Sequence, residues 1–257
     1  MEEVKESDEI VGKDVKYTIL KELSYGGKAE VYLVKKSNSN DNIQYAAKVP
    51  NKNEKIFDEE IEISKKIRDN INCKYLLKFI ESGEGIIYLN KKIEKKKYII
   101  FEFVKNRDIG EYIRFKHIGF DEVYSKVIFY KIIKGIQSIH DKNICHRDIK
   151  LDNILLDEDF NPKIGDFGYA TENSSELTEI CGTYNYLAPE VIYRDTYDGK
   201  KADIFSLGLA LIGLTTGKYK FYNPYKRALK NEYLVYELIV DGNKEAFFAL
   251  FGTSITL

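Results

Sequence analysis

Residues 146–168 constrain this chain more than any other segment. Two aspartates, a lysine and an asparagine lie there at fixed spacings, as Asp148, Lys150, Asn153 and Asp166. Short apolar runs and turn-forming residues alternate around them, which is typical of a loop held between strands. Carboxylate and amide oxygens bind Mg²⁺, and a lysine ammonium binds phosphate. The stretch therefore predicts a structured loop that holds metal ions and phosphate.

The same stretch closely resembles the catalytic loop and the metal-binding Asp-Phe-Gly turn of protein kinases. The resemblance implies that Asp148 accepts or orients the proton of the acceptor hydroxyl, and that Lys150 offsets charge on the transferred group. It also implies that Asn153 and Asp166 hold magnesium beside ATP. Charges that merely face water would explain any one of these residues. They do not explain the set, because its members match together and in order.

Strand patterns dominate the first 104 residues, and helical patterns dominate the rest. Strands are expected at 17–23, 30–35, 43–49, 76–81, 86–89 and 98–104, with one helix at 57–67. Further helices are expected at 109–115, 123–141, 202–215, 232–241 and 244–251. The basic run 90–97 is expected to form a solvated hairpin tip. The expected fold class is α+β, and the resemblance implies a two-lobed protein-kinase-like fold with a small antiparallel β lobe carrying one main helix and a large, mostly helical lobe.

The predicted domain boundaries follow from this change of pattern. Residues 1–16 are highly charged and predict a mobile extension. The kinase-like domain is expected over 17–257, with a small lobe over 17–103, a hinge at about 102–105 and a large lobe over 105–257. A cleft between the lobes would be the natural ligand site.

The resemblance stops near residue 251, whereas a family domain continues through further helices. The large lobe is therefore expected to be truncated, with its last helices missing. Glu190 should then lack the arginine that usually pairs with it, and apolar residues such as Leu207 and Phe248 should be poorly covered.

A hairpin near the start of the small lobe resembles the glycine-rich loop that covers the phosphates of ATP. Gly26 keeps one family glycine, whereas Ser24 and Ala29 stand where two others would be. Leu23 and Val31 would contact adenine. The two departures are expected to weaken phosphate contact and the affinity for ATP.

The third expected strand carries Lys48, which resembles the lysine that pairs with the α- and β-phosphates. Ala46, two residues earlier, is small enough to admit adenine. Glu60 fits best as the helix glutamate that partners the lysine, and Glu59 is its rival. Ser64 falls where the family generally has an apolar packing residue, and it is expected to weaken the packing behind the helix.

The last expected strand of the small lobe resembles the gatekeeper and hinge of the family. Phe101 would wall the back of the pocket, and Glu102 and Val104 would offer backbone groups to adenine. Asp108 falls where an acidic residue often meets the ribose or a substrate arginine. Leu155 would close the adenine pocket from below.

Residues 181–190 resemble the end of a kinase activation segment, which small-molecule kinases of related fold lack. Lys150 together with Thr183 marks the serine/threonine branch of the family. Asp203 begins the expected helix that, in the family, anchors the catalytic loop through the region of Arg147.

Arg147, next to Asp148, usually implies control by an anion in the activation loop. In family register that anion position falls on Glu179. We therefore consider that Glu179 substitutes in part for phosphate, with a solvated loop glutamate as an equally weighted alternative. Asp108 and Asp152 occupy positions that accept substrate arginines in basophilic members, so basic residues upstream of the acceptor are expected.

Composition limits the remaining possibilities. A formal net charge of −1 gives no reason to expect nucleic acid. No apolar segment follows Met1, and no apolar run reaches about 18 residues, so neither a signal peptide nor a membrane span is expected. Cys73, Cys145 and Cys181 are spaced neither for zinc nor for a disulfide framework and indicate reduced thiols. A cytoplasmic location is expected and a nuclear one stays open, while the oligomeric state is not indicated.

These features predict a serine/threonine protein kinase that uses ATP and Mg²⁺ to phosphorylate protein substrates. The alternative is a kinase-fold scaffold, or pseudoenzyme, that binds nucleotide or partners without useful catalysis. Ser24, Ala29, Ser64 and the expected truncation favour the scaffold. The intact Lys48 and the intact set in 146–168 favour the enzyme.

Overall fold

The structure is a computed structural model that describes residues 8–39, 41–51, 54–89, 91–116 and 118–217. These residues form two compact units. The first contains the described residues up to Asn72 together with Leu77–Lys105. The second contains Cys73–Leu76 and the described residues from Asn106 onward. The expected small lobe was continuous, but Cys73–Leu76 joins the second unit because the Ile164 N–H donates to the Tyr75 carbonyl at 2.8 Å.

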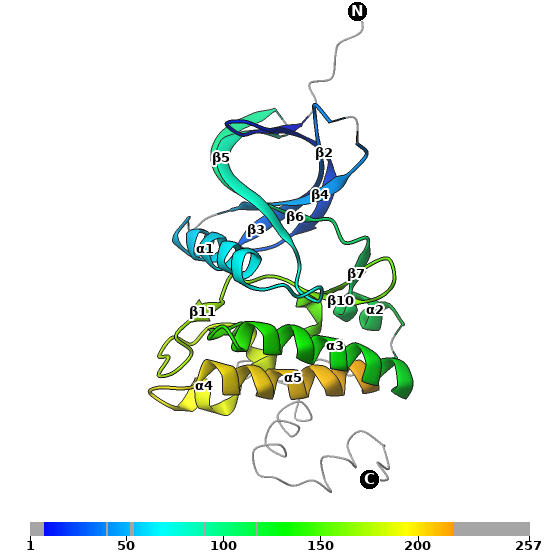
Figure 1. The fold of residues 1–257 in the computed structure, drawn as a ribbon, viewed down its shortest axis with the longest axis vertical. Helices are drawn as coiled ribbons and strands as arrows, with labels where there is room; N and C mark the ends of the chain where they lie inside the picture. The colour runs from blue at the N-terminus through cyan, green and yellow to red at the C-terminus, as the bar shows by residue number, and fades with distance from the viewer. Residues whose placement is uncertain (1–7, 40, 52–53, 90, 117, 218–257) are drawn as a thin grey trace, which may run out of the picture. The chain divides into compact units, whose positions relative to one another are not determined.

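A closed antiparallel barrel forms the body of the first unit (Figure 1), with its strands in the order β1-β2-β3-β4-β6-β5. The strands are β1 (Glu9–Val11), β2 (Lys16–Tyr25), β3 (Ala29–Lys36), β4 (Gln44–Pro50), β5 (Phe79–Leu89) and β6 (Lys92–Glu102). Closure leaves the barrel without a free edge along which another chain could pair.

The strand β1 closes the barrel by pairing with β2 on one side and β5 on the other. Ile10 lies opposite Tyr17 and Ile87, and its side chain is fully buried. The prediction of a mobile extension over 1–16 was therefore wrong for residues 9–11. The many charged residues outweighed the signal from Ile10, the one fully buried residue of β1, whose burial against two neighbouring strands fixes the segment.

The hairpin of β5 and β6 is longer than the sequence suggested. One continuous strand replaces the two expected at 76–81 and 86–89, and β6 begins at Lys92, inside the basic run. The backbone of that run pairs with β5, while side chains such as Lys95 stay exposed and reach Glu84 at 3.0 Å. Charged residues were thus mistaken for a loop, although they form the solvent-facing part of a ladder.

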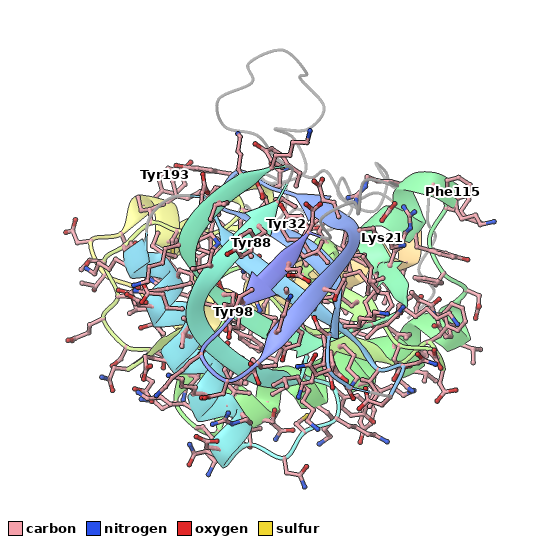
Figure 2. All side chains as sticks on the ribbon, turned by 90° about the horizontal axis from the view of Figure 1, so that it is seen from above. Lys21, Tyr32, Tyr88, Tyr98, Phe115 and Tyr193 are labelled. Atoms are coloured by element: carbon pink, nitrogen blue, oxygen red, sulfur yellow. The ribbon has the colours of Figure 1, made fainter. Side chains whose placement is uncertain are left out.

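Apolar side chains fill the barrel and the face beneath α1 (Glu54–Asn70). The barrel core consists of Ile10, Tyr17, Tyr32, Val34, Ala47, Val49, Ile87, Tyr98 and Ile100. A second cluster consists of Phe57 and Ile61 of α1 with Phe79, Ile99 and Phe101. Figure 2 labels two members of the barrel core, Tyr32 and Tyr98. The second cluster holds α1 against the sheet, which fixes the helix that carries Glu60.

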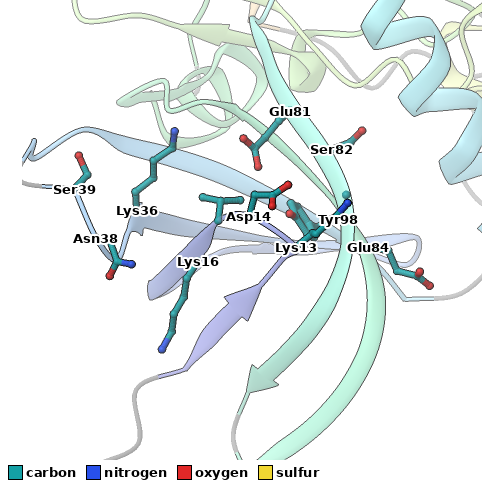
Figure 3. A pocket seen from close by; sticks show the side chains of 12 residues that line it. Lys13, Asp14, Lys16, Lys36, Asn38, Ser39, Glu81, Ser82, Glu84 and Tyr98 are labelled. Atoms are coloured by element: carbon teal, nitrogen blue, oxygen red, sulfur yellow. The ribbon is translucent and has the colours of Figure 1, made fainter.

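A cavity of about 820 Å³ lies beside the turn that joins β1 to β2 (Figure 3). Its walls mix acidic, basic and hydroxyl side chains, among them Lys13, Asp14, Glu81 and Tyr98. None of the residues expected to bind ATP lines it. This cavity is therefore distinct from the expected nucleotide site.

Helices dominate the described part of the second unit. They are α2 (Ile109–Lys116), α3 (Glu122–His140), α4 (Pro189–Tyr193) and α5 (Gly199–Thr216), with short 3-10 turns at Leu151–Asn153 and Tyr184–Tyr186. α3 and α5 lie side by side (Figure 1). The helices expected at 232–241 and 244–251, and Phe248, lie outside the described residues. No helix in the described ranges is both long and apolar enough to cross a membrane.

Capping and apolar spacing explain where α3 and α5 begin and what they bury. Asp121 accepts the Tyr124 N–H at 2.9 Å and starts α3, which buries Ile128, Ile132, Ile136 and Ile139 along one face. Asp198 caps α5 by accepting the N–H groups of Lys200 and Lys201, and Gly217 ends it at φ 73°. Leu207 in α5 is only 3% exposed, so the expectation that it would be poorly covered was wrong.

Short strands position the loop of residues 146–153. β9 (Ile154–Leu156) pairs with β10 (Pro162–Ile164) and β7 (Asn106–Asp108), and β8 (Ile144–Cys145) pairs with β11 (Thr171–Glu172). β8 immediately precedes the loop and β9 immediately follows it. The two flanking strands therefore fix both ends of the segment that carries Asp148, Lys150 and Asn153.

Candidate active site

In the first unit, Lys48 and Glu60 form a buried ion pair. The Lys48 Nζ donates to both carboxylate oxygens of Glu60, at 2.6 and 2.8 Å. The Glu60 side chain is 3% exposed, whereas the rival Glu59 is exposed. A buried carboxylate needs a cationic partner. The pair fixes the lysine at the centre of β4 against α1.

The other residues expected to contact adenine in the first unit lie on neighbouring strands. Ala46 on β4 lies directly opposite Phe101 on β6, and Phe101 is buried. The Glu102 N–H donates to the Lys78 carbonyl at 2.9 Å. Val104 follows β6 and is half-buried.

The hairpin of β2 and β3 carries the remaining first-unit residues. Leu23 and Gly26 are exposed, and Val31 lies opposite Ser24. The Gly26 N–H donates to the Ala29 carbonyl at 3.1 Å, which forms the turn of the hairpin. The structure thus places Gly26 in a tight turn flanked by the two positions that lack glycine.

Ser64 on α1 is buried and its hydroxyl has no hydrogen-bond partner in the described structure. From the sequence, serine here was expected to weaken the packing of α1, because the family generally has an apolar residue at this position. A buried hydroxyl without a partner destabilises the folded state.

In the second unit, three side chains gather beside the carboxylate of Asp148, two in direct contact and one through Lys150. The Asp148 Oδ2 accepts hydrogen bonds from the Lys150 Nζ at 3.0 Å and from the Asn153 Nδ2 at 3.1 Å. The Lys150 Nζ also donates to the Thr183 hydroxyl at 2.8 Å. The second oxygen, Asp148 Oδ1, is buried and has no hydrogen-bond partner within the described ranges. One carboxylate oxygen is thus fixed by hydrogen bonds, and the other can accept a hydrogen bond from a ligand.

Asp203 holds the backbone on the N-terminal side of that carboxylate. Its side chain is 1% exposed on α5. The Oδ2 accepts the His146 N–H at 2.8 Å, and the Oδ1 accepts the Arg147 N–H at 2.8 Å. The Oδ2 also contacts the His140 Nε2 at 2.8 Å. The expectation that α5 anchors this loop through the region of Arg147 matches these bonds, but nothing in the sequence spacing pointed to His140.

His146 packs and orients the loop. Its Nε2 lies 3.0 Å from the Gly165 carbonyl oxygen, and its Nδ1 lies 3.3 Å from the Asp148 backbone nitrogen. These neighbours assign the proton to Nε2, which donates to the carbonyl, while Nδ1 accepts the Asp148 N–H. The His146 ring also lies 5.2 Å from the ring of buried Phe167. Histidine therefore links Asp148 to the turn that carries Asp166.

The backbone is unusual at two positions of this site. Arg147 and Asp166 adopt φ values of 62° and 58°, in the left-handed region that residues other than glycine rarely occupy. Such strain persists only where surrounding contacts hold it, and it gathers at functional sites. Asp166 is exposed in the turn after β10, so its carboxylate can reach a ligand.

Arg147 connects the catalytic loop to the activation segment. Its Nε donates to the Tyr169 carbonyl at 2.6 Å, and its Nη1 donates to the Glu179 carboxylate at 3.1 Å. The Tyr197 hydroxyl donates to the Glu179 carbonyl at 2.7 Å. Glu179 therefore lies where the sequence placed it, against Arg147, although its side chain is 66% exposed.

Gly182 lets the activation segment approach the catalytic loop. Its φ is 103°, and a Cβ there would lie 2.4 Å from the Arg147 carbonyl oxygen. A larger residue would displace one of the two segments. Glu190, eight residues on in the same segment, has no ion pair among the described residues, while residues 218–257 lie outside them.

Acidic side chains gather where β7 meets α2. Burial, and then the nearby carboxylate of Asp152, raise the pKa of Asp108 from 3.8 to about 6. Arg114 contacts both carboxylates. Sequence reasoning identified the two aspartates but missed Arg114, since its position in the last turn of α2 carries no motif. Leu155, on β9, lies opposite Lys163 and is half-buried.

The two cysteines near this site are inert. Burial raises the pKa of Cys145 to about 12 and that of Cys181 to about 11. Their thiols are therefore protonated at neutral pH, and neither is a nucleophile.

The residues present fit a magnesium ion that is shared with phosphate. Among the described residues, no group of three or more His, Cys, Asp or Glu side chains is arranged to hold a metal. Mg²⁺ does not need such a group, because it keeps several waters and takes one or two carboxylates plus phosphate oxygens. The amide nitrogen of Asn153 donates to the Asp148 carbonyl and carboxylate, so its amide oxygen is the atom suited to a metal.

Comparison with known proteins gives this geometry a family. A probable serine/threonine-protein kinase of Dictyostelium discoideum is 34% identical over 183 residues, which cover 69% of this chain and 22% of that protein. Sperm motility kinase 3A of Mus musculus is 38% identical over 141 residues, 53% of this chain and 28% of that protein. CBL-interacting protein kinase 26 of Oryza sativa subsp. japonica is 32% identical over 233 residues, 85% of this chain and 44% of that protein.

The chain therefore spans less than half the length of each of these relatives. The sequence profile of the protein kinase domain matches residues 17–246, which is most of the chain. The chain belongs to the protein kinase domain family.

Proposed function

We propose that this chain transfers the γ-phosphate of ATP to serine and threonine hydroxyls of protein substrates. The observation that carries the proposal is the carboxylate of Asp148. One of its oxygens is held by Lys150 and Asn153, and the other is buried without a partner in the described structure. A buried acceptor without a donor is unfavourable. A substrate hydroxyl would supply the missing donor.

The proton of that hydroxyl would pass to Asp148 Oδ1 as the hydroxyl oxygen bonds to the γ-phosphorus of ATP. The bond from that phosphorus to the oxygen that bridges it to the β-phosphate would break, and ADP would leave with that oxygen. Phosphoryl transfer requires positioning and charge neutralisation more than covalent chemistry. Lys150, already 3.0 Å from the carboxylate, would offset charge on the transferred group. Its second bond, to Thr183, supports the assignment to the serine/threonine branch.

The roles in nucleotide binding follow from the family resemblance of each residue. Lys48, held by Glu60, would pair with the α- and β-phosphates, and Asn153 and Asp166 would hold magnesium. Magnesium, when bound, neutralises charge on the phosphates. Adenine would be contacted by the side chains of Leu23, Val31, Ala46, Phe101 and Leu155, and hydrogen-bonded by the backbone of Glu102 and Val104. The backbone of Gly26 would approach the phosphates. The carboxylate of Asp108 would bind the ribose or a substrate arginine.

Two observations favour the alternative of a kinase-fold scaffold without useful catalysis. Ser24 and Ala29 replace glycines that let the backbone approach phosphate, and buried Ser64 lacks a hydrogen-bond partner in the described structure. These departures would weaken nucleotide binding or loosen α1. They leave the Asp148 site unchanged, which is why catalysis is the first proposal.

The proposal includes the setting of the reaction. Protein substrates with basic residues upstream of the acceptor are favoured by the carboxylates of Asp108 and Asp152, one part-buried and the other partly exposed. A cytoplasmic location is proposed from composition alone. Imaging of the tagged chain in cells tests this location, and accumulation in the nucleus would contradict it.

Labelled ATP and three matched peptides, with serine, threonine or tyrosine as the only acceptor, test the reaction. We expect Mg²⁺-dependent labelling of the first two peptides and none of the third. Lys48→Met should weaken ATP binding, whereas Lys66→Met, at an exposed lysine of α1, should not. ATP binding without transfer to any peptide would favour the scaffold, and labelling of the tyrosine peptide alone would contradict the proposed acceptor.

A further inference from the structure

Arg114 of the chain itself contacts Asp108 and Asp152, the two carboxylates that are expected to bind a substrate arginine. The Arg114 guanidinium bonds through Nη1 to the Asp152 carboxylate and lies 3.6 Å, through Nη2, from the Asp108 Oδ1. The three residues come from three elements of the second unit, namely β7, the 3-10 turn Leu151–Asn153 and α2. One guanidinium thus bridges two acids that are distant in sequence.

Neighbouring contacts fix both carboxylates, whereas the long side chain of the arginine can move. Asp108 ends β7 and caps α2, since its Oδ1 accepts the Glu111 N–H at 2.6 Å. The Asp152 carboxylate packs against the first turn of α2, where a Cβ on Gly110 would lie 2.9 Å from its Cγ. Arg114 reaches the pair from the last turn of the same helix. The carboxylates are therefore preorganised, and the arginine is the adjustable partner.

The charges do not cancel. Two carboxylates meet one guanidinium, while the other arginine nearby, Arg107, forms an ion pair with Glu111 and acts on Asp108 through its charge. The three acids Asp108, Glu111 and Asp152 thus outnumber the two arginines by one. One negative charge therefore remains beside Arg114. The side chains of Arg114 and Asp152 are 39% and 34% exposed, so a guanidinium from solution can reach them. A partly exposed pair of this kind is weak enough to exchange partners.

We infer that Arg114 is a specificity-determining residue that competes with a substrate arginine for Asp108 and Asp152. The inference rests on the proposed function and refines it. The chain would show only a modest preference for upstream arginine, because its own guanidinium already occupies the acidic pair. Removal of that guanidinium would expose the full preference.

A peptide set tests the inference. Each peptide carries one serine and a single arginine at one of the five positions before it, and a reference peptide carries alanine throughout. The readout is the ratio of kcat/KM for each arginine peptide to kcat/KM for the reference, measured within each variant. In Arg114→Gln the ratio should rise about fivefold at the best position, since about 1 kcal/mol is the upper range for a partly exposed ion pair.

Two further variants separate competition from a general effect. Adding Asp152→Asn to Arg114→Gln should abolish the gain, because the exposed carboxylate is then lost. Arg107→Gln is the matched control, an arginine at the start of the same helix that pairs with Glu111, and its ratio should equal that of the unmodified chain. Should Arg114→Gln not fold, Arg114→Lys serves in its place, because an ammonium lacks the planar fork that bridges two carboxylates.

The outcomes distinguish this inference from the proposed function. Phosphorylation of all peptides with an unchanged ratio in Arg114→Gln, or in Arg114→Lys, overturns the inference and leaves the kinase proposal standing. Absence of phosphorylation contradicts the kinase proposal instead. In that case fluorescence anisotropy with labelled peptides that carry alanine at the acceptor decides the inference. Tighter binding of arginine peptides to Arg114→Gln than to the unmodified chain supports it, and equal binding overturns it.

Discussion

Asp203 is the residue whose removal should most damage the loop that carries Asp148. Its buried carboxylate accepts two backbone N–H groups, from His146 and Arg147, and contacts the His140 ring nitrogen, all at 2.8 Å. Asp203→Ala leaves three buried polar groups without their partner. At about 1–2 kcal/mol for each such group, the free energy of unfolding should fall by about 3–6 kcal/mol. That is a large fraction of the stability of an ordinary domain, about 5–15 kcal/mol.

Asp203→Asn gives a graded version of the same test. The amide keeps one acceptor oxygen but turns an NH₂ group toward a backbone N–H, so at least one of the three contacts is lost. The expected loss is about 1–3 kcal/mol. Because the catalytic loop then loses its anchor two residues before Asp148, kcat should fall roughly tenfold or more at a temperature where the variant is folded.

Urea unfolding followed by circular dichroism, together with peptide phosphorylation, measures both effects. Asp198→Asn is the matched control, because Asp198 caps the same helix and asparagine caps as well as aspartate. Its change in stability should stay below about 1 kcal/mol. If Asp203→Asn were as stable and as active as Asp198→Asn, the anchoring role of Asp203 would be refuted.

Three further predictions concern other parts of the chain. Ser64→Ala should raise the free energy of unfolding by about 1 kcal/mol in urea melts, because it removes a buried hydroxyl that has no hydrogen-bond partner in the described part of the chain; a loss of stability would contradict this. Ionised Asp108 is disfavoured in the folded state, so its penalty grows as the pH rises from about 4 to about 7. Asp108→Asn should therefore gain stability relative to the unmodified chain over that range, and a constant difference would argue otherwise. Glu179→Ala should lower turnover roughly threefold, since Arg147 loses its anion; unchanged turnover would mean that Glu179 is only a solvated loop residue.

Much of the fold could be predicted because its signals are local. The helical spacing of Ile128, Ile132, Ile136 and Ile139 is enough to define α3. Strand-forming residues that alternate or cluster along the sequence define β2 to β4. The closing strand β1 could not be predicted, because a single buried residue, Ile10, carries its packing. Its two partner strands lie on either side of it only after the barrel has formed.

The site shows the same division between motif and tertiary contact. Motifs indicated Asp148, Lys150 and Asn153, whose positions follow from one short loop. Contacts between distant segments are invisible to such patterns, as with His140 on Asp203 and Arg114 on Asp152. Those pairs depend on how α3 meets α5 and how α2 meets the catalytic loop. They could be found only once the helices were placed.

Asp148→Asn is the most direct test of whether Asp148 takes part in phosphate transfer. Asparagine keeps the shape of the side chain and removes the charge and the basic oxygen. The measurement is transfer from labelled ATP, with Mg²⁺, to a pool of basic serine and threonine peptides, alongside ATP binding and thermal unfolding of the same preparations. We expect the unmodified chain to label the peptides, and Asp148→Asn to stay folded and bind ATP but to transfer at least about a hundredfold less. Equal transfer by the two proteins would contradict a role of Asp148 in the reaction.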